Sequence, residues 1–230
     1  MSAANYAFND DTAIVVDDET FSLSIVTQLC RAIGFREVKS EKSVKDGLLA
    51  LRVSPPGSSP IIIADFRMPE HNGLELLKAV RMGVVHSDRS LPVLMLTGHT
   101  DAQLVALALK LDVDAFIAKP VSKAALEKRL IQIMNGTRQV KSVEEYGKIP
   151  TYVPSIEDVE EEVEEEVVDR GHVVEVKDLK PGDKLAAPVK LAGNGNALIE
   201  YGEVLNERLI ARLNDLEDMG SELSEIRVYA

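Results

Sequence analysis

Short apolar runs alternate with amphipathic stretches through the first part of the chain. Runs that are apolar on both faces are typical of strands in a parallel sheet that helices cover on both sides. Four such runs occupy residues 13–16, 60–64, 91–96 and 115–118, and a weaker strand is predicted at 36–40. Apolar residues at helical spacing predict helices at 21–33, 43–51, 73–82, 102–111 and 122–134. This alternation predicts an α/β domain with a doubly wound parallel sheet of five strands.

The alternating pattern is lost from Thr137 onward. Residues 157–169 contain nine acidic residues and no basic one, and Val159, Val163 and Val167 recur every four residues. This spacing of the valines is also compatible with a helix that pairs with a partner. However, six pairs of like charges spaced four residues apart oppose an isolated helix by about 1–3 kcal/mol in total. We therefore interpret residues 137–170 as an acidic linker rich in Pro and Glu.

A second folded segment is predicted from Gly171 to the end of the chain. Strand patterns occupy 173–176, 184–191, 197–201 and 225–229, with a Gly/Asn turn at 193–196, and a helix is predicted at 205–219. These elements make residues 171–230 a small, strand-rich α+β module. A module of about 60 residues is marginally stable alone, so we expect it to depend on dimerisation or on the first domain.

Composition narrows the classes of function. The 230 residues carry a net charge of −12, which argues against DNA binding because a phosphate backbone requires a basic surface. The predicted helix at 205–219 mixes two arginines with four acidic residues, unlike a basic recognition helix. No apolar run is long enough to cross a bilayer, no leader peptide is apparent, and the single cysteine, Cys30, excludes an intramolecular disulfide. A cytoplasmic protein without membrane insertion is expected.

Charged and hydroxyl side chains follow four of the predicted strands. They are Asp17 and Asp18, Asp65, Thr97 and Lys119. Because the carboxyl ends of parallel strands meet at one edge of a sheet, these side chains are expected to converge. At about 5 Å and an effective dielectric of about 20, each pair of carboxylates repels by roughly 3 kcal/mol, which calls for a cation. Oxygen ligands without nearby His or Cys favour Mg²⁺, and a lysine and a threonine suit anionic oxygens, so the set predicts a phosphoryl group held on a carboxylate.

Four sequence segments carry a family resemblance. They are AIVVDDE at 13–19, IIADFRMPEHNG at 62–73, VLMLTGH at 93–99 and FIAKP at 116–120. In this order and spacing they resemble the response regulator receiver domain of two-component signalling, over residues 10–136. The resemblance implies a flavodoxin-like sheet with strand order 2-1-3-4-5.

The resemblance also implies roles for individual residues. Asp65 would be the phosphoacceptor and one of the Mg²⁺ ligands. Asp18 would bind the metal directly, Asp17 mainly through water, and Arg67 through its backbone carbonyl. Lys119 would pair with the phosphoryl oxygens.

Other matched positions concern switching. Thr97 would donate its hydroxyl to the phosphoryl group and shift toward it, while Gly98 leaves the phosphoryl site open. Phe116 occupies the position of the switch aromatic and would turn inward as Thr97 moves, although a fixed core residue is the alternative. The Lys119–Pro120 peptide bond is expected to be cis.

Residues 176–229 resemble, more loosely, a small β-rich module found next to HD-GYP phosphodiesterase domains. The strings VKDLKPGDKLAAPVKL and ALIEYGEVLNERLIARL carry this likeness. None of the four histidines is followed by Asp and no GYP triplet occurs, so no phosphodiesterase activity is assigned. The protein is expected to be a self-phosphorylating and self-dephosphorylating switch, and not otherwise an enzyme.

The receiver resemblance implies a phosphorylation-controlled response regulator. A histidine kinase or a phosphotransfer protein would phosphorylate Asp65 with Mg²⁺, and output would pass through a downstream protein target or a homodimer. The alternative is a phosphate sink or a regulatory subunit of an enzyme supplied in trans, such as a cyclic-dinucleotide phosphodiesterase. A further hypothesis is that the acidic run at 157–169 folds onto a basic strip formed by Lys123, Lys128, Arg129, Arg138 and Lys141. The alternative is that the run only keeps the two domains apart.

Overall fold

The structure, a computed structural model, describes residues 6–55, 60–85, 88–98, 102–136, 138–152, 171–191 and 197–229. The chain divides into two compact units. Unit 1 comprises Met1–His99 and Leu111–Thr151, and unit 2 comprises Thr100–Lys110 and Tyr152–Ala230. The acidic run at 157–169 and the turn predicted at 193–196 lie outside the described residues.

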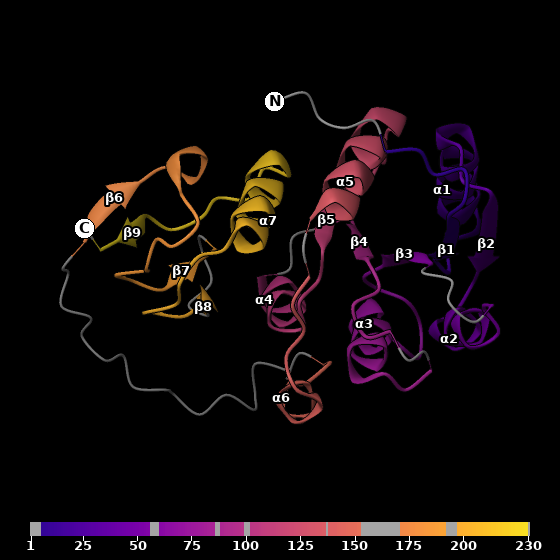
Figure 1. Ribbon diagram of the computed structural model, residues 1–230, viewed down its shortest axis with the longest axis horizontal. Helices are drawn as coiled ribbons and strands as arrows, with labels where there is room; N and C mark the ends of the chain where they lie inside the picture. The colour runs from indigo at the N-terminus through magenta and orange to yellow at the C-terminus, as the bar shows by residue number, and fades with distance from the viewer. Residues whose placement is uncertain are drawn as a thin grey trace. The chain divides into compact units, whose positions relative to one another are not determined.

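Unit 1 is built on one parallel sheet (Figure 1). Its strands are β1 (Thr12–Val16), β2 (Glu37–Glu41), β3 (Ile61–Asp65), β4 (Val93–Thr97) and β5 (Ala115–Ala118). They lie in the order β2-β1-β3-β4-β5 with every neighbouring pair parallel, so the predicted order 2-1-3-4-5 is confirmed. The inner strands β1, β3 and β4 are buried along their whole length, whereas the edge strand β2 is partly exposed. This exposure explains why the apolar signal of β2 was the weakest.

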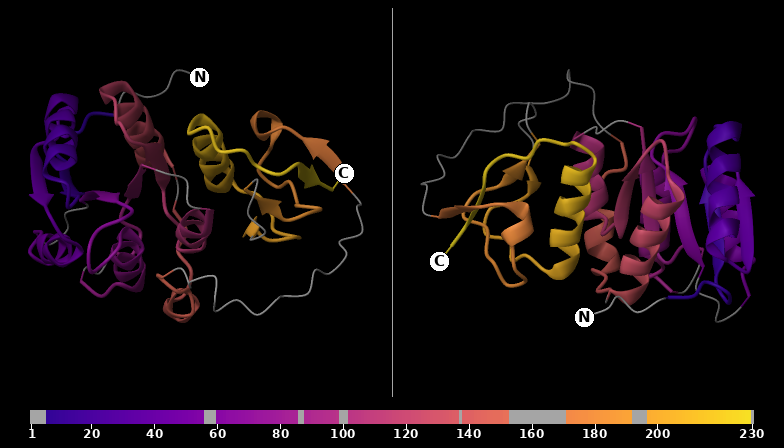
Figure 2. Two further views of the ribbon diagram at one scale, coloured as in Figure 1. Left: turned by 180° about the vertical axis from the view of Figure 1, so that it is seen from behind. Right: turned by 90° about the horizontal axis from the view of Figure 1, so that it is seen from above.

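Helices cover both faces of this sheet. Figure 1 shows α1 (Thr20–Ile33) and α5 (Lys123–Asn135) on one side of the strands and α2 (Val44–Arg52) and α3 (Gly73–Met82) on the other, and the reverse view in Figure 2 agrees. Alternate strand residues pack with apolar residues of α1 and α5 in one buried cluster. The predicted doubly wound arrangement is therefore confirmed, because period-two strands supply an apolar surface to each layer of helices.

Unit 1 continues beyond α5, through the short helix α6 (Val143–Gly147) to Thr151. Ser142 caps α6, and its Oγ accepts from the Glu145 N–H while the Glu145 carboxylate accepts from the Ser142 N–H. Tyr146 is completely buried. The linker predicted from Thr137 onward differs from the structure, in which residues 138–151 belong to the first folded unit. A five-residue helix with one buried aromatic residue is too short to show a helical repeat of apolar residues in the sequence.

Unit 2 contains one helix from the middle of the chain and the elements of the C-terminal segment. They are α4 (Ala102–Lys110), β6 (His172–Val174), the 3₁₀ helix η2 (Val176–Asp178), β7 (Val189–Lys190), β8 (Ala197–Ile199), α7 (Glu207–Asp218) and β9 (Ile226–Val228). Strands β6 and β9 form one antiparallel pair, and β7 and β8 form another. Within this unit α4 packs against β8, and Lys110 Nζ lies 3.3 Å from Glu200 Oε1.

Three of the five members of the basic strip inferred from the sequence have partners within unit 1. Arg129 is 9% exposed and Nη1 donates to Gln132 Oε1. Arg138 pairs with Asp114 and Lys141 with Asp112, both within unit 1. Arg129 bonds within α5, whereas Arg138 and Lys141 find their partners because the chain after α5 turns back onto the domain. Among the described helices, none has the length and apolar character needed to cross a membrane.

Candidate functional site

Asp65 is the last residue of β3, and the chain folds back sharply after it. The Arg67 N–H donates to Asp65 Oδ2 at 2.9 Å, and the Gly73 N–H donates to the Phe66 carbonyl at 3.0 Å. A Cβ at Gly73 would lie only 2.3 Å from the Asp65 carbonyl oxygen. Glycine therefore allows the start of α3 to approach the end of β3, and the loop at 66–72 is held against Asp65.

Lys119 connects two carboxylates at this edge of the sheet. Its Nζ lies 2.8 Å from Asp17 Oδ2 and 2.5 Å from Asp65 Oδ1. The Lys119 N–H donates to the Thr97 carbonyl at 2.8 Å, which continues the pairing of β5 with β4 beyond the strand end. The peptide bond between Lys119 and Pro120 is cis. Strands β1, β3, β4 and β5 thus bring Asp17, Asp65, Thr97 and Lys119 to one edge.

Asp17 is fully buried and also positions the start of α1. Its Oδ1 accepts from the Glu19 N–H at 3.0 Å, and its Oδ2 accepts from Ser22 Oγ at 2.6 Å. Ser22 was not singled out from the sequence, where a serine five residues after an aspartate carries no distinctive signal. Asp18, the neighbouring residue, is exposed.

The pKa values of Asp65 and Lys119, which form the shortest ion pair of the site, are both shifted. Burial raises the pKa of Asp65 above its ordinary value of 3.8, although the Lys119 ammonium works in the opposite direction. Burial opposes the charged form of Lys119, but hydrogen bonds to Asp17 and Asp65 outweigh it and raise the pKa of the lysine. Lys119 is therefore held as a cation. Its ammonium is shared by the carboxylates of Asp17 and Asp65, and the Asp65 carboxylate is more basic than usual.

The residues expected to switch lie beside this group. Thr97 ends β4 and is buried. Phe116 on β5 is only 1% exposed and stacks parallel to Phe66, with ring centroids 6.0 Å apart. The aromatic ring expected to turn inward is thus already inside the domain. Gly98 is exposed, and a Cβ there would meet no atom within 4 Å.

The residues at this edge suit a hard divalent cation in their chemistry. The side-chain donors are carboxylate oxygens of Asp17, Asp18 and Asp65, and the Arg67 backbone carbonyl is near Asp65 in sequence. The contact of Lys119 with both Asp17 and Asp65 shows that two carboxylates share a cation here. Among the described residues, however, no group of three or more His, Cys, Asp or Glu side chains is arranged to hold a metal. The donor set fits Mg²⁺ through Asp17 and Asp65, while exposed Asp18 does not join them in a group of three.

Comparison with known families agrees with this geometry. Residues 13–131, more than half of the chain, match the family model of the response regulator receiver domain. The chain belongs to this family. The receiver domain carries phosphorylation-controlled signalling, acts as a switch, and in this family binds Mg²⁺ at its phosphorylation site and interacts with histidine kinases or phosphotransfer proteins.

Individual relatives match about half of the chain. The chain is 32% identical over 120 residues to chemotaxis protein CheY-3 of Vibrio cholerae serotype O1, covering 52% of this chain and 88% of the relative. It is 28% identical over 120 residues to chemotaxis protein CheY of Pseudomonas aeruginosa, covering 52% of this chain and 93% of the relative. Among solved structures, a receiver domain protein from Clostridium thermocellum is similar with a TM-score of 0.49 and 26% identity, covering 54% of this chain and 94% of that one.

Proposed function

We propose that this protein is a response regulator that accepts a phosphoryl group on Asp65 from a histidine kinase or a phosphotransfer protein. The observation that supports this most is the ammonium of Lys119, whose Nζ contacts both Asp17 Oδ2 and Asp65 Oδ1. An anionic group added to Asp65 would find a cation already in contact with the accepting oxygen.

The chemical step uses Asp65 as the nucleophile. A carboxylate oxygen of Asp65 attacks phosphorus and forms a P–O bond, while the P–N bond of a phosphohistidine donor breaks and the imidazole leaves with the electron pair. Hydrolysis reverses the modification, because water attacks phosphorus, the P–O bond to Asp65 breaks, and inorganic phosphate leaves.

Three further groups would act on the phosphoryl oxygens. Lys119 would exchange its contact with the Asp65 oxygen for the more highly charged phosphoryl oxygens. Thr97, at the end of the neighbouring strand, would donate its hydroxyl and act as the switch. Exposed Gly98 would leave room for the donor to approach.

Asp17, Asp65 and the Arg67 carbonyl would hold Mg²⁺, and the exposed Asp18 carboxylate would join them as a ligand only after turning toward the ion. The ion would supply positive charge to the transferring phosphoryl group. Asp17 is positioned for this role by Ser22 and by the Glu19 N–H, which restrict the rotation of its carboxylate. Output would then pass through a downstream protein target or a homodimer.

Intact-mass measurement tests the proposal. The full chain is incubated with Mg²⁺ and acetyl phosphate, and we expect one phosphoryl adduct per chain. The variant Asp65→Asn should carry no adduct, because an amide oxygen is not a comparable nucleophile. An adduct of equal yield in Asp65→Asn would place the modification elsewhere and refute the assignment. If neither acetyl phosphate nor a phosphorylated histidine kinase gave an adduct, the protein would be a receiver-shaped scaffold and the proposal would be wrong.

A further inference from the structure

Residues 138–152 form a segment that we call the strap, and its course is unusual for a chain leaving α5. Helix α5 follows β5, so it begins at the carboxyl edge of the sheet and ends at the amino edge. Helix α3 follows β3 and runs in the same sense, from Gly73 to Met82. A chain that simply left the domain after Asn135 would depart at the amino edge, far from the end of β3. The strap instead contacts α3 along its length.

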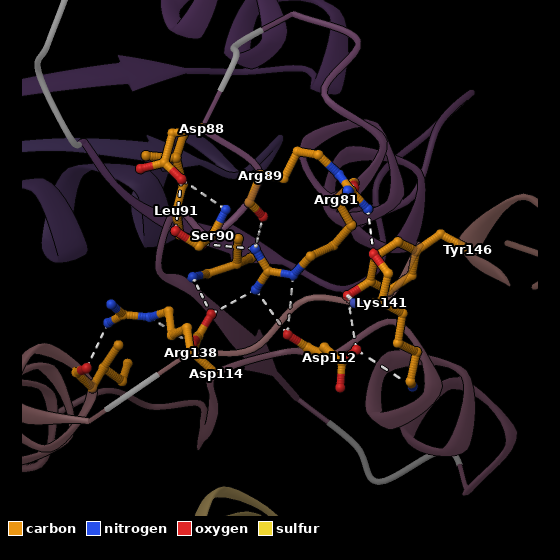
Figure 3. Close-up of polar contacts among 12 residues, drawn as sticks. Arg81, Asp88, Arg89, Ser90, Leu91, Asp112, Asp114, Arg138, Lys141 and Tyr146 are labelled. Atoms are coloured by element: carbon orange, nitrogen blue, oxygen red, sulfur yellow. Dashed lines mark hydrogen bonds and ion pairs between the residues drawn. The ribbon is translucent and has the colours of Figure 1, made fainter. Parts of the chain in front are cut away.

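The first half of the strap is anchored to the residues that precede β5 (Figure 3). Tyr146 OH donates to Asp112 Oδ2 at 2.8 Å and accepts from the Lys141 N–H at 3.0 Å. Arg138 Nε lies 2.9 Å from Asp114 Oδ1. The other oxygen of Asp114 pairs with Arg81 Nη2 of α3 at 2.7 Å, and both of these side chains are buried.

Arg89 adds a second clamp on this half. Its Nη2 donates to the Lys141 carbonyl at 2.5 Å, and its guanidinium lies 5.6 Å from the centroid of the Tyr146 ring. Its Nε donates to the Arg81 carbonyl at 2.5 Å. The start of the strap is therefore fixed to the C-terminal end of α3, which lies at the amino edge of the sheet.

The second half of the strap runs back along α3 toward its beginning. Lys78 Nζ donates to the Gly147 carbonyl at 3.0 Å and to the Ile149 carbonyl at 2.6 Å. Asn72 Nδ2, at the N-cap of the same helix, donates to the Thr151 carbonyl at 2.6 Å. The chain thus leaves unit 1 beside the loop at 66–72, on the edge where Asp65 ends β3.

The side chain of Asn72 makes two different hydrogen bonds. Its Oδ1 accepts from the Glu75 N–H at 3.1 Å and caps α3, while its Nδ2 holds Thr151. The loop that ends at Asn72 begins with the Arg67 N–H bonded to the Asp65 carboxylate. Only six residues separate the phosphoacceptor from the residue that holds the strap.

We propose that the strap is an output device: the Asn72–Thr151 hydrogen bond holds it closed while Asp65 is a free carboxylate, and phosphorylation releases it. This inference rests on the proposed function of Asp65. The Asp65 carboxylate is a charged acceptor for the Arg67 N–H. In the acyl phosphate its two oxygens become neutral, and the negative charge moves to the phosphoryl oxygens, which lie one P–O bond further from β3, so the Arg67 N–H can keep a charged acceptor only by changing position. Phosphorylation therefore displaces the loop at its first anchor, Asn72 loses its fixed position, and the end of the strap at Thr151 is released from α3.

Hydrogen–deuterium exchange of the full chain tests this device. Amide exchange within residues 138–152 is followed by mass spectrometry with Mg²⁺, in the presence and absence of acetyl phosphate, and the intact mass of each sample reports the adduct. Release of one hydrogen bond is expected to speed exchange at Tyr146–Thr151 about threefold to tenfold. Unchanged or slower exchange in a sample that carries the adduct would overturn the inference and leave the proposed function standing.

Two variants test the contact without phosphorylation. Asn72→Asp keeps an oxygen that caps α3 but cannot donate to Thr151, so exchange in the strap should already be fast and should not rise further with the adduct. Lys78→Met removes two hydrogen bonds to the strap and should also speed its exchange. Lys45→Met, the same change at an exposed residue of α2, should not.

The outcomes separate the two hypotheses. If neither acetyl phosphate nor a phosphorylated histidine kinase gives an adduct, the proposed function fails, and the resting comparison of Asn72→Asp with the wild type still decides whether Asn72 holds the strap. If the adduct forms and Asn72→Asp exchanges like the wild type, the strap does not depend on Asn72, and the inference is wrong.

Discussion

At the scale of the residue, burial determines how this domain uses its charged and phenolic groups. Arg81 is completely buried, and its guanidinium satisfies three backbone carbonyls besides Asp114. Tyr146 is buried next to Asp112, and burial followed by this carboxylate raises the pKa of its phenol to about 12. Both buried polar groups are hydrogen-bonded, and they share Asp112, whose carbonyl accepts from Arg81 of α3 and whose carboxylate accepts from Tyr146 of the strap.

The pKa of Tyr146 predicts a pH dependence of stability. Its folded-state pKa lies above the ordinary value of 10, so the stabilisation is fully present below about pH 10 and is lost as pH rises toward 12. Between about pH 9 and pH 11, the free energy of unfolding of the wild type should fall by about 1 kcal/mol more than that of Tyr146→Phe. Urea unfolding at each pH measures the difference, since the other tyrosines are common to both proteins. Parallel pH curves would contradict the assignment.

At the scale of the element, the site depends on how closely α3 approaches the end of β3. The helix begins at Gly73, where its backbone lies against the Asp65 carbonyl, and Asn72 caps it. Helix α1 is positioned similarly at the end of the neighbouring strand β1, where the Asp17 carboxylate accepts from the Glu19 N–H. The reactive groups are therefore placed by helix starts as much as by the strands.

A methyl group at Gly73 should disturb this approach. In Gly73→Ala the new Cβ would overlap the Asp65 carbonyl oxygen, which is backbone and has little freedom to move. We expect a loss of about 1–3 kcal/mol in the free energy of unfolding and a lower yield of phosphoryl adduct on Asp65. The control is Gly147→Ala, because a Cβ there would meet no atom within 4 Å. Equal stability and adduct yield in Gly73→Ala and the wild type would show that the close approach is unimportant.

At the scale of the whole molecule, the two folded units do not coincide with the two domains predicted from the sequence pattern. Helix α4 belongs by sequence to the alternating first domain, yet it falls in unit 2 with the C-terminal elements. The apolar residues Val105, Ala108 and Leu109 of α4 are buried, and the helix packs against β8. Unit 2 is therefore not a continuous segment of the chain.

This division predicts the behaviour of the C-terminal segment in isolation. A fragment of residues 153–230 lacks α4, so the amides of β8 should exchange with deuterium faster in the fragment than in the full chain. Strands β6 and β9 pair with each other and serve as the internal control, with a smaller change expected. Equal exchange of β8 in the fragment and in the full chain would show that α4 does not stabilise it.

Much of the first domain could be predicted from local pattern. The strands and helices of unit 1 up to α5 were located to within about two residues, because buried parallel strands are apolar on both faces and their helices repeat at 3.6 residues. The segment after α5 could not be predicted, because its contacts join Tyr146 to Asp112 and Asn72 to Thr151 across 34 and 79 positions.

The sequence by itself determined the fold class, the strand order implied by its family resemblance, and the set of reactive residues at the strand ends. These depend on periodicity and on residue type at fixed positions, which are local properties of the chain. Only the tertiary structure decided that Lys119 bridges Asp17 and Asp65, that Asp18 is exposed, and that residues 138–151 return along α3 to the edge where Asp65 ends β3. Each of these depends on side chains from distant segments meeting in a buried environment, where hydrogen bonds and desolvation act on pairs that no local pattern contains.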